Sequence, residues 1–397
     1  MPSASSYTNK IRALTDSRNS KVQYPGNVVN TYRPALSLTC DTDIVPSVVT
    51  IAGVPNVSGY AGDGGPATQA TLNNPQAVCT DSIGNIFITD TGNQRVRKID
   101  TSGKITTLQL TDAGTPITFG GLDAPIGMTI GSDNTLYITD PNTEPEGRIV
   151  KVTPQGVGEF ITHPDSTDDV RYLYRPYSLW ISNNKLYVAN YRGYISSAGG
   201  VYPGTVSVFD IASGQWEANT YDAGDAAGAY TNFAYPRYAS VGPDGSIYIV
   251  RKANAVSSPF NHCVRRYKNG QYTTFAGTSN SSGNSGDGGP ATAAKLDTPS
   301  SVFPDAFGNV YICDTGNGRI RMVSPDGIIQ TVVGGGSSYN EGGHPLQILA
   351  APVSMWFDAQ GRMYFTDASS TVRRINSVYK PAWWDPLQYE KICKPCN

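Results

Sequence analysis

The feature that most constrains this chain is a segment that occurs twice. Residues 62–75 begin with Gly-Asp-Gly-Gly-Pro-Ala-Thr and end in proline, and residues 286–299 repeat this pattern. Each copy is followed by a second shared block, at residues 84–97 and 308–321. This block runs from Gly-Asn through a hydrophobic stretch to Asp-Thr-Gly-Asn and an Arg-x-Arg pair. Self-similarity at a fixed internal spacing is typical of repeat architectures.

Four weaker copies of the second block lie between and after the two strong ones. Each follows a proline and consists of an aromatic or β-branched run and then a second β-rich run. We therefore expect six structural units of one kind. The six units align at Asp90, Asp140, Asn190, Val250, Asp314 and Asp367.

Each unit is predicted to contain four short strands. Strand-forming runs separated by Gly, Asn and Asp turns, without helical periodicity, indicate an all-β fold. Four strands per unit of this length are typical of a blade, so the expected fold is a six-bladed β-propeller. The last unit shows no fourth strand before Tyr379, while residues 47–53 resemble the segments 273–277 and 331–334 that precede other units. We expect this N-terminal strand to complete the last blade and close the ring.

The repeated pattern resembles the NHL repeat, closely in two units and loosely in four. The resemblance covers residues 47–376 and implies an NHL-like propeller, but it leaves the function open because such propellers serve as protein-binding, RNA-binding and enzymatic scaffolds. The expected domains are an extended N-terminal arm (1–46), the propeller (47–376) and a short C-terminal tail (377–397) that contains Cys-Lys-Pro-Cys.

The charge of the chain argues against a nucleic-acid partner. The formal net charge is −2 at pH 7 and the sequence pI is about 5.9, so no general attraction to a polyanion is expected. Arginine pairs do recur, but they recur at one position of the unit, on the third strand. This regularity favours a repeated structural role, with one face of that strand in contact with solvent.

The repeated aspartates are predicted to shape turns. Asp and Asn at the end of a strand accept hydrogen bonds from nearby backbone N–H groups, and the glycines of the Gly-Asp-Gly-Gly-Pro loops permit positive φ. A ring of carboxylates around a central metal is the alternative. The residues concerned are Asp63, Asp90, Asp140, Asp287, Asp314 and Asp367.

The three histidines define an enzymatic alternative. In the four-strand pattern His163 and His344 lie in loops between blades, and His262 lies in the loop before a third strand. These loops share one face of the ring, so a three-histidine metal site for a hydrolase or lyase is conceivable. None of the three occupies a repeated position, and no nucleophile or nucleotide motif accompanies them. Scattered loop histidines and no cofactor are the preferred interpretation.

The N-terminal arm is the part of the chain that six blades do not require. From residue 21 onward it is apolar, aromatic and punctuated by proline, with few charges, which is not the composition of a solvated disordered tail. It is predicted to lie on a surface or to add a strand to a neighbouring subunit. The candidate interaction residues are Tyr24, Val28, Val29, Tyr32, Leu36 and Leu38.

The cysteines outside the repeats favour an oxidising environment. Cys40 lies in the arm and Cys393 and Cys396 lie in the tail, where they are candidates for a disulfide within or between chains. Cys79, Cys263 and Cys313 are expected to be core thiols. Residues 1–15 lack the apolar core of a signal peptide, and no stretch is long and apolar enough for a membrane span. The first dozen residues are similar to leaders on proteins of giant DNA viruses.

These observations predict a non-enzymatic structural or interaction propeller. We expect it to be a self-assembling subunit of an extracellular fibre or virion surface that docks through its arm, as a homo-oligomer or filament. Two alternatives stay open. One is the metal-dependent hydrolase or lyase on the histidine-bearing face, and the other is a monomeric module that binds a peptide or glycan.

Overall fold

The computed structural model describes residues 46–112, 115–117, 122–142, 147–156, 158–161, 173, 175–191, 204–217, 221–222, 236–251, 262–339 and 341–376. Within these residues the chain forms β-strands and short 3-10 turns, and no α-helix. The expected arm and tail lie outside the described residues, apart from the last residue of the arm, so the domain boundaries stay predictions.

Six antiparallel sheets of the described chain are the blades, and each extends from an inner strand at the channel to an outer strand at the rim. Blade 1 contains β2 (Pro75–Thr80), β3 (Ile86–Asp90), β4 (Arg95–Ile99) and β5 (Ile105–Thr107). Blade 2 contains β8 (Met128–Ile130), β9 (Leu136–Asp140), β10 (Arg148–Val152) and β11 (Gly158–Ile161). Blade 3 contains β12 (Pro176–Ser182), β13 (Lys185–Asn190), β14 (Thr205–Asp210), β15 (Gln215–Trp216) and β16 (Tyr221–Asp222).

The remaining blades follow the same order. Blade 4 contains β17 (Pro236–Val241), β18 (Ile247–Arg251), β19 (Val264–Lys268) and β20 (Gln271–Ala276). Blade 5 contains β21 (Ser301–Pro304), β22 (Val310–Asp314), β23 (Arg319–Val323) and β24 (Ile329–Gly334). Blade 6 contains β25 (Pro352–Phe357), β26 (Met363–Asp367), β27 (Thr371–Ile375) and β1 (Val48–Ala52). A small hairpin, β6 (Leu110–Asp112) and β7 (Thr115–Ile117), follows blade 1.

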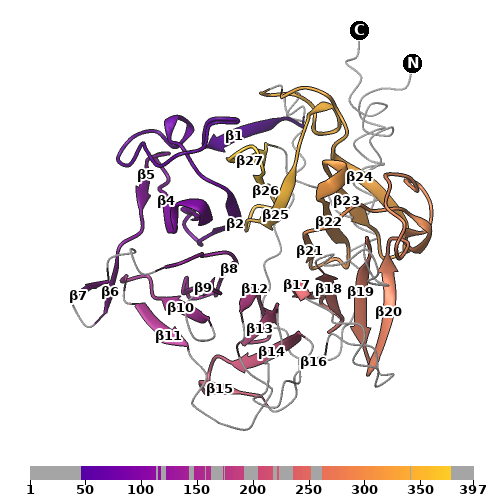
Figure 1. Ribbon diagram of the computed structural model, residues 1–397, viewed down its shortest axis with the longest axis horizontal. Coiled ribbons are helices and arrows are strands. Elements are labelled where there is room, and N and C mark those ends of the chain that lie inside the picture. Colours follow the sequence, from indigo (N-terminus) through magenta and orange to yellow (C-terminus); the bar gives the residue numbers. More distant parts are fainter. Residues whose placement is uncertain are drawn as a thin grey trace, which may run out of the picture. The chain divides into compact units, whose positions relative to one another are not determined.

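The blades form a closed ring. Each inner strand contacts the inner strand of the next blade, in the order β2, β8, β12, β17, β21, β25 and back to β2, and Figure 1 shows the sheets arranged around a common centre. The prediction of an all-β, six-bladed propeller is therefore confirmed. Closure by neighbours on both sides leaves each blade with only its short outer edge unpaired.

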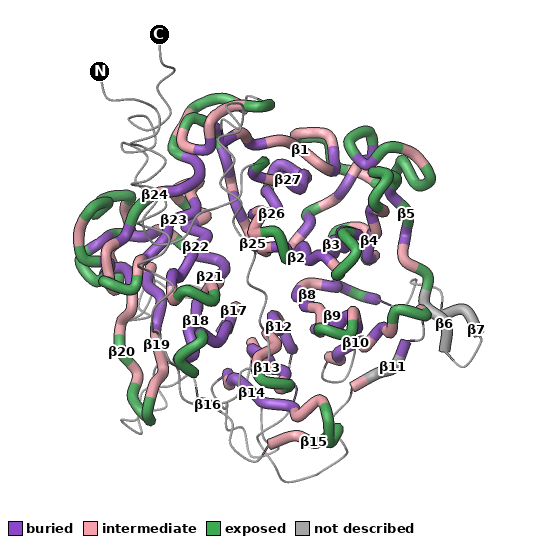
Figure 2. The backbone as a smooth tube through the Cα atoms, turned by 180° about the vertical axis from the view of Figure 1, so that it is seen from behind, coloured by how far each residue is buried: buried purple, intermediate pink, exposed green. Residues whose placement is uncertain are grey.

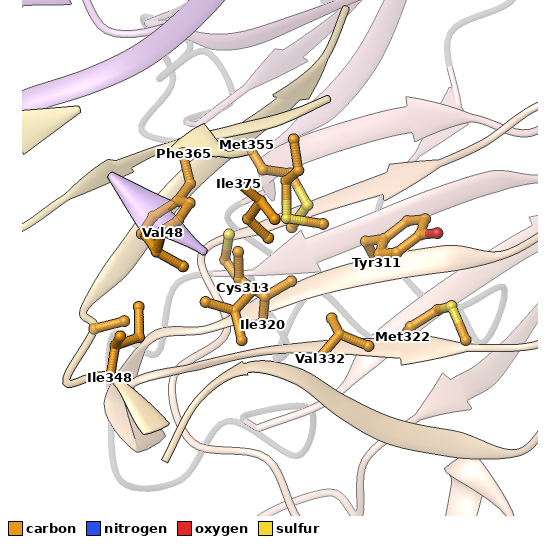
Figure 3. Close-up of a cluster of buried hydrophobic side chains, with 13 residues drawn as sticks. Val48, Tyr311, Cys313, Ile320, Met322, Val332, Ile348, Met355, Phe365 and Ile375 are labelled. Carbon is orange, nitrogen blue, oxygen red and sulfur yellow. The ribbon is translucent and has the colours of Figure 1, made fainter. Parts of the chain in front are cut away.

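The ring is closed by β1, as the sequence predicts. It pairs antiparallel with β27, so blade 6 takes its fourth strand from the N-terminal side of the chain. The side chain of Val48 is fully buried beside those of Phe365 and Ile375, in a cluster shared by blades 5 and 6 (Figure 3). Removing this strand would expose both that cluster and the edge of β27, so β1 is structurally required for blade 6.

The apolar core lies between the blades. One cluster fills the space between blades 5 and 6, and another joins blade 6 to blade 1 through Tyr364 and Leu72. The second strand is buried along its whole length in blades 1, 2, 4, 5 and 6 (Figure 2), because each of its faces packs on a neighbouring sheet. Burial on both faces explains why these strands are continuous hydrophobic runs and not alternating ones.

Two details of blades 3 and 4 differ from the expected repeat. The outer edge of blade 3 consists of two short pieces, β15 and β16, which both pair with β14. In blade 4 the strand register aligns Arg251, and not Val250, with Asp90, because Pro236 pairs with Arg251 as Pro75 pairs with Asp90. The alignment at Val250 was wrong by one residue, since the sequence of this blade contains no acid or amide there to mark the end of the strand.

Candidate functional site

A concave site of the described chain lies at the central channel, between the inner strands of the six blades. The residue that follows the proline of each repeat lines this pocket, so every blade contributes one side chain. The six equivalent residues are Gln76, Ile126, Tyr177, Arg237, Ser300 and Val353. The backbone around them repeats while their chemistry differs, which is the arrangement expected of a site that is placed on a scaffold.

A register shift sets these side chains apart from regular strand positions. The pairing of the first and second strands slips just after the proline in blades 1, 3, 4 and 6, at residues 75–78, 176–178, 236–238 and 352–354. Such bulges bend a strand locally and turn a side chain away from the direction that regular pairing gives it. Here the shift coincides with the residue that lines the channel.

A ring of hydroxyl groups holds the channel wall in place. Thr89 on β3 donates to Ile126 O of the next blade at 3.0 Å and accepts from Ala77 N at 2.8 Å. Thr139 and Thr366 occupy the same register in blades 2 and 6 and donate to Tyr177 O and Gln76 O of the following blades. Ser178 accepts from Ala239 N, and Ser300 donates to Val353 O. These bonds join five of the six pairs of neighbouring blades.

The pocket is small and carries one charge among its described residues. The space that a water-sized sphere can enter is about 30 Å³, which corresponds to about two water molecules. Arg237 is the charged side chain of the lining, and its guanidinium carbon lies 5.7 Å from the centroid of the Tyr177 ring. Tyr177 in turn packs against Tyr191, with ring centroids 5.4 Å apart. The innermost part of the pocket therefore admits only a small group.

The aspartates of blade 1 form a buried cluster with arginine. Arg97 on β4 is fully buried and donates to Asp63 at 2.7 Å and to Asp90 at 3.2 Å. Asp90 also accepts from Asn73 N at 2.7 Å, and Asp63 also accepts from Thr107 at 2.7 Å. Arg97 is thus held between the loop before the blade and the end of the second strand.

The two acids of this cluster are shifted in opposite directions. Burial raises the pKa of Asp90, and the bonds from Asn73 N, Asn93 and Arg97 do not fully offset it. Partial burial also raises the pKa of Asp63, but the bonds from Thr107 and Arg97 outweigh it and hold that pKa below its usual range.

Blade 5 repeats this cluster. Arg321 is fully buried, donates to Asp287 at 2.6 Å and lies 4.0 Å from Asp314. Asp287 accepts from Thr331 at 2.7 Å, as Asp63 does from Thr107. Burial raises the pKa of Asp314 to about 6.

Blade 6 has a variant of the cluster. Arg373 lies 4.0 Å from Asp367 and donates to Leu349 O at 2.9 Å. Tyr339 donates to Asp367 at 2.8 Å, with the guanidinium of Arg373 5.0 Å from its ring centroid. Glu341 replaces the loop aspartate and accepts from Thr50 on β1.

Blades 2, 3 and 4 lack this arrangement within their described residues. In blade 2 the position of Arg97 is occupied by Val150, and Asp140 pairs with Arg148 at 3.1 Å. In blade 3 Asn190 donates to Ser207 at 2.7 Å. In blade 4, Arg251 occupies the position of Asp90 and Arg265 that of Arg97, and both arginines are buried. Among the described residues the cluster is therefore found in three adjacent blades.

The arginines that the sequence places on a solvated strand face are buried in blades 1, 5 and 6. The recurring arginines indicate a repeated structural role, as expected. The prediction that their face of the third strand is solvated is wrong, because the loop before each of these blades folds over that strand. Arg97, Arg321 and Arg373 are each 0 % exposed. The sequence signal for this burial is the joint presence of the loop acid, the strand-end acid and the arginine in one unit.

The described histidines hold loops together. His262 lies 3.2 Å from Asp297 and accepts from Thr298 N at 3.2 Å. His344 accepts from Leu346 N at the start of a 3-10 turn, Pro345–Gln347. His163 lies outside the described residues. No group of three His, Cys, Asp or Glu suited to a metal ion is found in the part of the chain that the structure describes.

The other predicted residues are divided between the core and the undescribed ends. Cys79, Cys263 and Cys313 are buried free thiols, and burial raises the pKa of Cys313 to about 12, so core thiols are confirmed. The six candidate interaction residues of the arm, and Cys40, Cys393 and Cys396, lie outside the described residues. No described helix has the length and hydropathy of a membrane span.

Sequence reasoning missed the ring of channel residues. The available signal was the proline itself, which opens every unit and is followed by polar, aliphatic, aromatic or charged residues in different units. A position that varies between repeats, flanked by positions that do not, is where a repeat protein differentiates its units.

A comparison with known protein families identifies the type of repeat. The family model of the teneurin NHL domain matches residues 16–118 and 276–351. These stretches include blades 1 and 5, where the repeated blocks are most complete. The chain is an NHL-repeat β-propeller. The match to the teneurin NHL domain indicates a propeller of the interaction-module type.

The relatives are much longer proteins. Teneurin-1 of Gallus gallus is 35% identical over 125 residues, which is 27% of this chain and 4% of that protein. Teneurin-1 of Homo sapiens is 26% identical over 320 residues, which is 72% of this chain and 10% of that protein. The chain thus spans about a tenth or less of these curated relatives. Neither is viral, so the faint leader resemblance to giant DNA virus proteins is unsupported.

A solved structure shares the fold. A protein of unknown function from Bacteroides thetaiotaomicron superposes on this propeller with a TM-score of 0.61 and 15% sequence identity. The superposition covers 83% of this chain and 76% of the other. At this identity the likeness shows the fold alone.

Proposed function

We propose that this propeller is a non-enzymatic interaction module that binds another protein. The observation that carries the proposal is the channel mouth, whose free space of about 30 Å³ is too small for a substrate of ordinary size. The hydroxyl groups around it are engaged in bonds between blades. No observation on the described residues favours a metal-dependent enzyme.

The partner that we propose is a second copy of the chain. The arm supports this, because residues 21–40 combine aromatic and apolar side chains with proline and few charges. An arm that docks on a neighbour makes a heterologous contact, which closes into a ring or extends into a filament. The cysteines of arm and tail are then available as covalent links between subunits, in an extracellular setting.

The test is the mass in solution of the full-length chain compared with a chain that begins at Thr42. The shortened chain keeps β1 and therefore the closed blade 6. Light scattering should give a mass above that of a monomer for the full-length chain and the mass of a monomer for the shortened chain. A matched variant, Tyr24→Ser with Tyr32→Ser, removes two aromatic side chains from an otherwise intact arm and should behave like the shortened chain.

Reductant separates the covalent contribution from the apolar one. If Cys40, Cys393 or Cys396 joins subunits, the mass falls on reduction of the full-length chain and not of the shortened one. A full-length chain that is monomeric throughout, at the concentrations at which the protein is present naturally, contradicts self-association through the arm.

A further inference from the structure

The channel mouth contains one cation that no described residue neutralises. Arg237 lies on β17 directly after Pro236, in the register-shifted part of blade 4. Among the described residues its guanidinium makes a ring contact with Tyr177 and no hydrogen bond or ion pair. The buried arginines Arg97 and Arg321 elsewhere in the propeller each bond to carboxylates. Arg237 differs from these two arginines in having no carboxylate partner among the described residues, and it lines a pocket to which all six blades contribute.

The walls of this pocket favour a small anionic group. The described lining residues include no Asp or Glu, so nothing repels a negative charge there. Ser300 donates to Val353 O and Gln76 donates to Asn74, and neither side chain is hydrogen-bonded to Arg237. Ile126, Met128 and the other apolar neighbours lower the local dielectric and strengthen an ionic contact that forms inside.

The free space sets the size of the ligand. A volume near two water molecules accommodates a carboxylate and a methylene or two, so only the end group of a larger partner enters it. A carboxylate also matches the planar, two-pronged arrangement of guanidinium donors. The Tyr177 ring lies beside Arg237, with the guanidinium carbon 5.7 Å from the ring centroid, and stabilises the cation from one side.

We propose that the channel mouth is a binding site for a single carboxylate of a protein partner, with Arg237 as the residue that recognises it. The carboxylate belongs to an acidic side chain or to a chain terminus that enters the mouth. Displacement of the few waters held there contributes to binding.

This inference rests on the proposed function in that the carboxylate comes from a protein. The two are tested by different measurements and fail separately. Peptide binding is measured on the propeller mouth whatever the assembly state, whereas self-association is measured by mass and depends on the arm.

The experiment is a titration of the full-length protein with short acetylated peptides at low ionic strength, followed by NMR of the peptide. One peptide, acetyl-Gly-Gly-Asp-Gly-Gly-amide, offers a side-chain carboxylate, and a second, acetyl-Gly-Gly-Gly with a free terminus, offers a terminal one. Their neutral counterparts contain Asn in place of Asp, or an amidated terminus. The charged form of at least one pair should bind at least tenfold more tightly than its neutral form, and the pair that responds identifies the source of the carboxylate.

Variants assign the effect to the pocket. Arg237→Gln should lower the affinity for the responding peptide at least tenfold. Arg237→Lys should have an intermediate affinity, because lysine keeps the positive charge but lacks the two parallel N–H donors of the guanidinium. Arg374→Gln is the matched control, since Arg374 is a half-buried arginine that bonds Asn376 on the outer part of blade 6. It should bind as the parent chain does.

The proposal is overturned if charged and neutral peptides bind equally, if neither binds at millimolar concentration, or if Arg237→Gln binds unchanged. Thermal unfolding of each variant shows whether the fold is intact. If Arg237→Gln unfolds at a clearly lower temperature than the parent chain, the test rests on Arg237→Lys. Peptide affinity that stays the same in a stable lysine variant, also at high salt, would exclude a two-pronged, charge-dependent contact.

Discussion

Blades 5, 6 and 1 hold their outer strands by a different means from blades 2, 3 and 4. The first arc, blades 5, 6 and 1, buries an arginine of the third strand against an acid of the second strand, and in blades 1 and 5 also against an acid of the preceding loop. The second arc, blades 2, 3 and 4, places Val150, Ser207 and Arg265 at that register. The two arcs share strand order and differ in what ties the connecting loop to the blade.

The loop contacts of the first arc also hold β1, the strand that closes the ring. In blades 1 and 5 the Gly-Asp-Gly-Gly loop bonds to the backbone of Ile105 and Ile329 on the fourth strand. In blade 6 the corresponding loop bonds in the same way to Val48 on β1. The strand that comes from the N-terminal side is thus held by the same contacts as a strand that belongs to its blade. The acid and threonine repeat too, as Asp63 with Thr107, Asp287 with Thr331 and Glu341 with Thr50.

The glycines of these loops are required by close approach. Gly62 and Gly286 have φ of 91° and 102°, and a Cβ on either would lie 2.6 Å from the Cα of an alanine four residues beyond the loop. Only glycine adopts this backbone without strain, which is why the loop sequence is the most faithfully repeated part of the chain.

The largest expected effect is removal of β1 from the first arc. A chain that begins at Gly53 loses the burial of Val48 and Ala52 and the ladder to β27, and we expect it to lose more than about 4 kcal/mol of stability. Urea unfolding of this chain and of one that begins at Thr42 measures the difference. Equal midpoints for the two chains would show that β1 is dispensable.

The second effect compares one arginine from each arc. Arg97→Met leaves Asp90 buried without its cation and should cost about 3–5 kcal/mol. Arg148→Met removes an arginine that is 19% exposed, so water can approach the place that it leaves beside the buried Asp140, and the cost should be smaller, about 2 kcal/mol. The cost of Arg97→Met should shrink as the pH is lowered, because burial raises the pKa of Asp90 and a proton then replaces the lost charge. Similar costs in both blades would remove the distinction between the arcs.

The third effect is a pH dependence. Burial raises the pKa of Asp314 from 3.8 to about 6, so the folded chain binds this proton more tightly than the unfolded chain does. The stabilisation from this group is therefore present below pH 3.8 and is lost as the pH rises to about 6, by at most about 3 kcal/mol. From pH 4 to pH 7, the free energy of unfolding of the parent chain should fall relative to that of Asp314→Asn.

An exposed acid of the same blade serves as the control for that measurement. Asp326→Asn lies in the turn before β24 and should follow the parent chain across the whole range. If Asp314→Asn also follows the parent, the carboxylate is already charged at pH 4 and its burial has no measurable effect on its titration.

The smallest effect is expected at the acid–threonine contact of blade 6. Thr50→Val removes the hydroxyl that bonds Glu341 and keeps the shape of the side chain, so we expect a loss of about 1 kcal/mol. Thr273→Val is the control, since Thr273 is an exposed threonine of β20 in the second arc, and it should change stability by less than about 0.5 kcal/mol. Denaturant midpoints resolve this difference. A neutral Thr50→Val would show that the backbone bonds to Val48 suffice to hold β1.

Sequence reasoning succeeded where a property is local and repeated. Four strands per unit follow from the spacing of turn residues and β-rich runs, and the role of residues 47–53 follows from their likeness to segments 273–277 and 331–334. It failed in blade 4 because Arg251 carries no signature of a strand end. It also gave the arginines a solvent face, since an alternating strand pattern does not reveal that a distant loop covers that face.

By itself the sequence determined the number of blades, the order of their strands and the strand that closes the ring, because turn chemistry and hydrophobic runs act over a few residues and are repeated in each unit. Only the tertiary structure decided which polar groups meet. The pairing of Arg97 with Asp63, across 34 residues, and the convergence of one residue from each of six blades on the channel depend on closure of the ring. Burial of a charge and the shape of a pocket are properties of that closed arrangement and of no single segment.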